Sequence, residues 1–149
     1  MRRLVVLTVL VLALSFIVWT QLVTPVSAKV IPANVNIDPD ALLLKEGGHG
    51  SWITANIGLP KGYYAGNINV SSVALEVMGA HVRVTMHETR GNTLMVKFDR
   101  SLVISLLWSM TGHMSPHVKQ EITLEVAGTM FDGNAFRGSD TIRVFFTQP

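Results

Sequence analysis

The chain has 149 residues, with 12 Lys or Arg and 10 Asp or Glu, and a formal net charge of +2. Arg2 and Arg3 account for that excess, so the rest of the chain carries as many basic as acidic residues. A near-neutral domain gives no electrostatic reason to expect nucleic acid or an anionic membrane as a partner. The chain has no cysteine, which excludes disulfides and thiol nucleophiles.

The N-terminal segment has the pattern of an export signal. Arg2 and Arg3 precede Leu4–Val18, a mostly apolar run, and Val26-Ser27-Ala28 forms a small-residue cleavage pattern. We interpret residues 1–28 as a secretory signal peptide, which predicts a secreted or cell-surface protein.

An uncleaved membrane anchor is the alternative interpretation of the same segment. Leu4–Val23 covers twenty residues, enough to span a bilayer. In either case the rest of the chain leaves the cytoplasm. Residues 29–149 are expected to form a single β-sandwich domain, large enough to bury a core without disulfides.

Short alternating segments predict strands along the first half of this domain. Residues 29–33 are expected to be a tether, and Asp38-Pro39-Asp40 a turn, because Asp and Pro favour turns. The expected strands contain Val35 and Ile37, Leu42–Leu44, Ser51–Leu59, Ile68–Val70, Val73–Val77 and Val82–Met86.

The stretch Thr93–Trp108 is predicted to be a strand that runs directly into a helix. Its strand part alternates apolar and polar side chains, and Asp99 is placed to cap a helix from about Arg100. The residues expected on the apolar face of that helix are Leu102, Val103, Leu106, Leu107 and Met110.

Two further strands follow the helix and complete the predicted fold. Ile122–Val126 and Thr141–Thr147 alternate, and Asp132-Gly133-Asn134 between them predicts a hairpin. Seven to nine short strands bounded by Gly, Pro, Asp or Asn predict an all-β protein. We expect an antiparallel β-sandwich, immunoglobulin- or cohesin-like, with one short α-helix after a core strand.

Three segments carry a resemblance to a known module: Leu94–Arg100 (LMVKFDR), Glu121–Gly128 (EITLEVAG) and Phe136–Val144 (FRGSDTIRV). Together they resemble a β-sandwich module of exported archaeal and bacterial cell-surface proteins, often found near dockerin-like or cohesin-like domains. The resemblance implies location more than activity. Relatives often carry an Asp-rich calcium loop before the first segment, whereas here Thr85–Thr93 offers only Glu88, so calcium is not expected.

No catalytic, cofactor-binding or metal-binding residue is assigned, and we do not expect an enzyme. Gly138-Ser139-Asp140 could belong to a hydrolase triad, but no serine sits in a GxSxG elbow and a turn is the simpler interpretation. Asp38 and Asp40 could bind a cation or act as acid and base, but the proline turn explains them better.

Two ligand-binding alternatives remain open. Met110, His113, Met114 and His117 could offer thioether and imidazole ligands to copper. Alternatively they form a surface loop after the helix. His81 and His87 are expected on one exposed face of a strand, about 20 Å apart, too far for one site.

The second alternative is glycan binding. Trp52, Tyr63 and Tyr64 could form an aromatic platform for carbohydrate, although Trp52 could equally pack beneath a loop. Asn69-Val70-Ser71 is the single N-glycosylation sequon.

The preferred hypothesis is an exported, non-enzymatic structural or interaction module. Its partner would be a protein at the cell surface or another copy of the chain, and the membrane would be contacted only through an uncleaved N-terminal segment. Phe145 and Phe146 are adjacent, so one ring is expected to face outward as a contact. A free Lys29–Val35 segment could add a strand to a neighbouring sheet.

Overall fold

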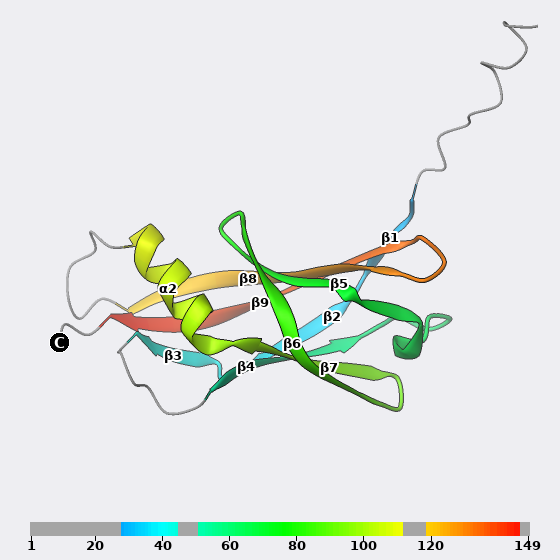
Figure 1. Ribbon diagram of the computed structural model, residues 1–149, viewed down its shortest axis with the longest axis horizontal. Helices are drawn as coiled ribbons and strands as arrows, with labels where there is room; N and C mark the ends of the chain where they lie inside the picture. Colours follow the sequence, from blue (N-terminus) through cyan, green and yellow to red (C-terminus); the bar gives the residue numbers. More distant parts are fainter. Residues whose placement is uncertain (1–27, 45–50, 112–118, 147–149) are drawn as a thin grey trace, which may run out of the picture.

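The computed structural model describes residues 28–44, 51–111 and 119–146. These residues form nine strands, one α-helix and one short 3-10 helix (Figure 1). The predicted all-β class, with one helix directly after a core strand, is confirmed.

The elements have the following bounds. The strands are β1 (Val30–Pro32), β2 (Asn34–Asp38), β3 (Ala41–Leu44), β4 (Trp52–Gly58), β5 (Ile68–Val77), β6 (Ala80–Arg90), β7 (Thr93–Asp99), β8 (Lys119–Met130) and β9 (Ala135–Phe146). The 3-10 helix is η1 (Ala65–Asn67) and the α-helix is α2 (Arg100–Thr111).

All nine strands belong to one mixed sheet in the order β1-β9-β8-β5-β6-β7-β4-β2, and β3 also pairs with β9. The sheet is mixed because β1 and β3 run parallel to β9, whereas every other pair is antiparallel. Strand β6 joins the two halves, pairing with β5 through its first residues and with β7 through the rest, and it crosses the others diagonally (Figure 1). The arrangement is therefore nearly barrel-like, and a sandwich of two separate sheets stays a prediction.

The sheet nearly closes where β2 lies beside β9. The Ala33 N–H donates to the Arg137 carbonyl oxygen at 2.8 Å, and the Ile37 N–H donates to Oδ2 of Asp140 at 2.7 Å. Gly138 lies between these two bonds, and a Cβ there would meet the Ala33 carbonyl and stand 2.6 Å from Cγ2 of Val35. Only glycine lets the chain pass β9 this closely as it leaves β1. We call residues 33–37 with Gly138 and Asp140 the seam.

Three expectations about these segments are wrong. The tether expected at residues 29–33 contains β1, whose Ile31 is fully buried, because parallel pairing with β9 places this side chain in the core. For the same reason Lys29–Val35 is not free to add to a neighbouring sheet. Gly138-Ser139-Asp140 is not a turn but the middle of β9, where Asp140 bonds β2.

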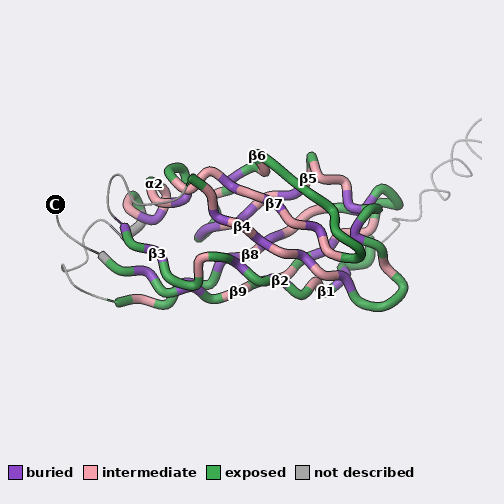
Figure 2. Tube along the Cα trace, turned by 90° about the horizontal axis from the view of Figure 1, so that it is seen from below, coloured by how far each residue is buried: buried purple, intermediate pink, exposed green. Residues whose placement is uncertain are grey.

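Alternation along the strands builds the core as predicted. In β4 and β7 every second residue is buried, and Leu94, Val96 and Phe98 are inaccessible to solvent. Figure 2 shows buried and exposed positions following one another along most strands. The Asp38-Pro39-Asp40 turn between β2 and β3 is confirmed, with a cis Asp38–Pro39 peptide, and so is the Asp132-Gly133-Asn134 hairpin.

The cap of α2 is confirmed. Oδ1 of Asp99 accepts the Ser101 N–H at 2.8 Å and the Leu102 N–H at 3.3 Å. Hydrogen bonds from the Ser101 side chain, and then from these two amides, lower the pKa of Asp99 below its ordinary value. They favour the charged carboxylate at the positive end of the helix.

Part of the predicted apolar face of α2 is wrong. Val103 and Leu107 are buried one turn apart, and Leu106 is half-buried, but Leu102 is 55% exposed. Leu102 precedes Val103 by one residue, about 100° around the helix, and so points away from the sheet. The Met110 side chain lies outside the described residues. Within the three described stretches, no helix has the length and apolar character needed to cross a membrane.

Candidate interaction surface

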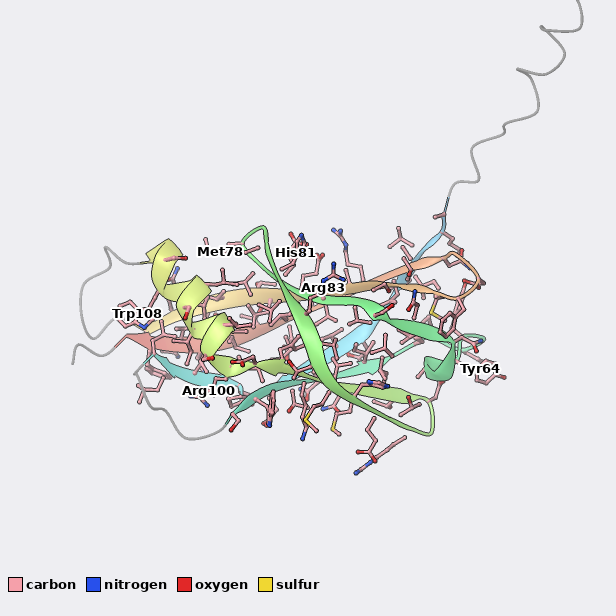
Figure 3. The ribbon with its side chains drawn as sticks, in the orientation of Figure 1. Tyr64, Met78, His81, Arg83, Arg100 and Trp108 are labelled. Carbon is pink, nitrogen blue, oxygen red and sulfur yellow. The ribbon has the colours of Figure 1, made fainter. Side chains whose placement is uncertain are left out.

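Several loops meet at the end of the molecule opposite α2, where β1 begins and where Tyr64 is labelled (Figures 1 and 3). We call this surface the loop end and define it by residues 29–30, 60–67, 91–92 and 131–134. Its loops are the connection between β4 and β5, the β6–β7 turn and the β8–β9 hairpin.

Hydrogen bonds between loops hold this end together. Oδ1 of Asn92 accepts the Ala65 N–H at 3.0 Å, and Nδ2 of Asn92 donates to the Tyr63 carbonyl at 3.2 Å. The Phe131 N–H donates to the Asn67 carbonyl at 2.9 Å. Three loops that are distant in sequence are therefore fixed relative to one another.

Lys29 attaches the start of the domain to the same surface. Its carbonyl oxygen accepts the Ala135 N–H at 3.0 Å, and its Nζ lies 5.6 Å from the centre of the Tyr63 ring. A side-chain hydrogen bond with Tyr63 raises the pKa of Lys29 above its ordinary value. Lys29 therefore remains a cation at the loop end throughout the neutral pH range.

Three apolar side chains of the loop end face solvent. Val30 is 59% exposed, Tyr64 67% and Phe131 73%, although Ala65 directly after Tyr64 is buried. These side chains stay exposed because hydrogen bonds fix the backbone to which they are attached. Exposed apolar groups that gather on one surface are typical of interaction sites.

Charged and polar groups lie beside these side chains. Lys29 and Lys61 are exposed, whereas both carboxylate oxygens of Asp132 accept bonds from Asn134, at 3.0 and 2.9 Å. The loop end thus offers aromatic and aliphatic surface with exposed lysine side chains beside it. Such a surface fits an apolar or amphipathic partner.

The structure does not bring Trp52 together with Tyr63 and Tyr64. Trp52 begins β4 and pairs with Asp99, next to α2, whereas both tyrosines follow the far end of that strand. Six residue steps along β4 alone span about 20 Å. The predicted aromatic platform for carbohydrate is therefore wrong, and only Tyr64 is an exposed aromatic of this set.

His81 and His87 do not share one face of β6. Val84 pairs with Phe98 but Met86 pairs with Lys97, so β6 contains one extra residue between these pairs. Such a bulge reverses the alternation beyond it. Met86, expected to face inward, is consequently 51% exposed on the side of Lys97.

Beyond the bulge lies a shallow open depression of about 80 Å³, lined by Met86, His87, Glu88, Met95 and Lys97. Its carboxylate is already engaged, because Glu88 accepts bonds from Nε and Nη2 of Arg90 at 2.8 and 3.0 Å. The Arg90 hydrogen bond lowers the pKa of Glu88. The depression is much smaller than ligand pockets of 300 Å³ or more, and the described residues contain no group of three His, Asp or Glu placed for a metal.

The other residues predicted to make contacts are not among those that define the loop end. His113, Met114 and His117, with the Met110 side chain, fall outside the described residues, so the copper hypothesis stays a prediction. Phe145 is 37% exposed beside its pairing partner Leu43, as expected for an outward ring. Asn69 of the sequon is half-buried on β5, and its Oδ1 accepts the Ser71 hydroxyl at 2.7 Å.

Sequence reasoning missed the loop end as a surface. A signal was present, since Phe131 directly precedes the Asp132-Gly133-Asn134 turn, where an apolar side chain has little to pack against. The meeting of the three loops, however, depends on bonds between residues 27 or more positions apart.

The chain matches no protein-family model, and comparisons with curated proteins and with solved structures find no significant similarity. The resemblance to exported cell-surface modules therefore stays a prediction.

Proposed function

We propose that this protein is an exported, non-enzymatic module that acts by contact at the cell surface or outside the cell, using the loop end. Export is supported by the sequence of residues 1–28, with two arginines, an apolar run and a small-residue ending. Contact is supported by one observation above others: Val30 at the start of β1, and Tyr64 and Phe131 on hydrogen-bonded loops, are all exposed at the loop end.

The exposure of these three side chains to water is unfavourable in free energy. Each of these side chains leaves apolar area in water, which disfavours the free protein, and fixed loops cannot collapse to cover it. A partner that covers the three side chains gains their burial without first having to order the loops. Preformed surfaces of this kind bind with less loss of conformational entropy.

Export can be tested with thiol labelling, because the natural chain has no cysteine. The variant Met78→Cys presents one exposed thiol outside the loop end, because Met78 is 64% exposed on the β5–β6 turn. A membrane-impermeant maleimide added to intact cells should label this variant. Labelling that appears only after lysis would contradict export.

Contact through the loop end can be tested with a photo-crosslinking amino acid at position 131 and, as the matched control, at position 78. Both positions are exposed and apolar, but only the first belongs to the loop end. We expect a crosslinked product, with a protein or with lipid, in intact cells from position 131 alone. Equal products from the two positions, or none from position 131, would contradict a contact made by this surface.

A further inference from the structure

We propose that the loop end rests on the outer surface of the cell membrane, with the N-terminal apolar run retained as the anchor that holds it there. This proposal rests on the proposed function, because it requires export, and it names the partner of the same surface. The partner is the lipid interface of the membrane that the chain itself crosses.

Only a few residues separate the apolar run from the domain. Leu4–Val23 has twenty residues, which as a helix span about 30 Å, the thickness of a bilayer's hydrocarbon core. Val23 and Lys29 are six residues apart, so the connecting chain reaches at most about 20 Å. If the run lies in the membrane, Lys29 stands within that distance of the bilayer.

Lys29 itself belongs to the loop end. Its carbonyl is bonded to Ala135 and its ammonium lies over Tyr63, so no free tether separates the start of the domain from this surface. Figure 1 shows β1 beginning at the end opposite α2. A membrane reached through Lys29 therefore meets the loop end before any other part of the described domain.

The side chains of the loop end suit the interface between a membrane and water. Tyr64 and Phe131 are more exposed than any other aromatic side chain that the structure describes, and Lys29 and Lys61 belong to the same surface. Tyrosine is enriched where membranes meet water, and lysine can lie along the interface with its ammonium at the headgroups. Val30 and Phe131 supply apolar area that the acyl boundary would cover.

The orientation agrees with the proposed export. Arg2 and Arg3 precede the apolar run, and positive charges favour the cytoplasmic side. The run therefore points the domain outward, with the loop end towards the outer leaflet and α2 away from it. Exposed Leu102 on α2 is an apolar position that should stay in water.

The experiment uses the full chain reconstituted in phosphatidylcholine vesicles containing a minority of phosphatidylglycerol. Single-cysteine variants Tyr64→Cys, Phe131→Cys and Leu102→Cys are labelled with an environment-sensitive fluorophore. We expect a blue-shifted emission at positions 64 and 131, with quenching by nitroxide-labelled lipids, and neither effect at position 102. Unchanged melting temperatures of the three variants confirm that each is folded.

Two results would overturn the proposal. One is an emission at positions 64 and 131 that matches position 102 and is insensitive to nitroxide lipids. The other is a mass of the protein from cells that begins at Lys29, since cleavage removes the anchor. Either result leaves export and a protein contact intact if impermeant maleimide still labels cells and position 131 crosslinks to a protein, so the two proposals fail separately.

Discussion

Hydrogen bonds hold both the seam and the loop end in place, but the seam packs tightly whereas the loop end leaves apolar side chains exposed. At the seam, backbone and side-chain bonds bring β2 against β9 until there is no room for a Cβ at Gly138. At the loop end, hydrogen bonds between loops hold Tyr64 and Phe131 in solvent. Bonds that close a sheet over its core serve stability, whereas bonds that hold apolar side chains away from the core leave them available for contact.

Gly138→Ala should have the largest effect on stability. The added methyl group would meet the Ala33 carbonyl and Cγ2 of Val35, and backbone cannot yield as a flexible side chain would. We expect a loss of about 3 kcal/mol or more in the free energy of unfolding, measured in urea. Gly66→Ala is the control, because a Cβ there meets no atom within 4 Å, and its effect should stay within about 0.5 kcal/mol. Equal losses in the two variants would show that the seam is not tightly packed.

Asp140→Asn should have the next largest effect. Oδ2 of Asp140 accepts the Ile37 N–H and Oδ1 accepts the Thr141 N–H at 2.8 Å, so both oxygens are used. An amide keeps one acceptor and loses the charge, which should cost about 1–3 kcal/mol in urea unfolding. Asp132→Asn, whose carboxylate accepts bonds from Asn134 within its own hairpin, is the control and should cost less.

Asp99→Ala should have a smaller effect, since it removes the cap of α2. We expect the melting temperature to fall by roughly 2–5 °C at neutral pH. The native pKa of Asp99 is lowered, so the stabilisation is present above the unfolded-state pKa and disappears as the pH falls through the native one. The difference between wild type and variant should therefore shrink in acid, and a difference independent of pH would contradict the charged cap.

Tyr64→Ser and Phe131→Ser should have the smallest effect on stability. Both side chains are mostly in solvent, so removing either should change the free energy of unfolding by no more than about 0.5 kcal/mol. A loss above about 2 kcal/mol in urea unfolding would mean that these residues belong to the core rather than to a contact surface.

Local patterns predicted most of the fold. Strict alternation placed Leu94, Val96 and Phe98 in the core, and Asp99 was recognised as a cap because capping involves only the next few residues. The Asp132-Gly133-Asn134 hairpin was equally local. Where the interactions lie within a few residues, the amino-acid pattern was sufficient.

The wrong predictions concern pairing between distant residues. The bulge before Met86 depends on how β6 aligns with β7. Because β6 contains one extra residue there, Met86 and His87 lie on the faces opposite to those predicted. The strand at Val30–Pro32 exists because β9 offers it a parallel partner more than a hundred residues later. Trp52 and Tyr64 are close in sequence, but a fully extended β4 separates them.

The most direct test of the central claim combines stability and contact in one variant. Tyr64→Ser and Phe131→Ser are introduced together into the full chain, with a photo-crosslinking residue at exposed Lys61 of the loop end. The account predicts an unchanged melting temperature and a loss of the crosslinked product in intact cells. An unchanged crosslink yield in the folded double variant would contradict the assignment of the loop end as the surface by which this protein acts.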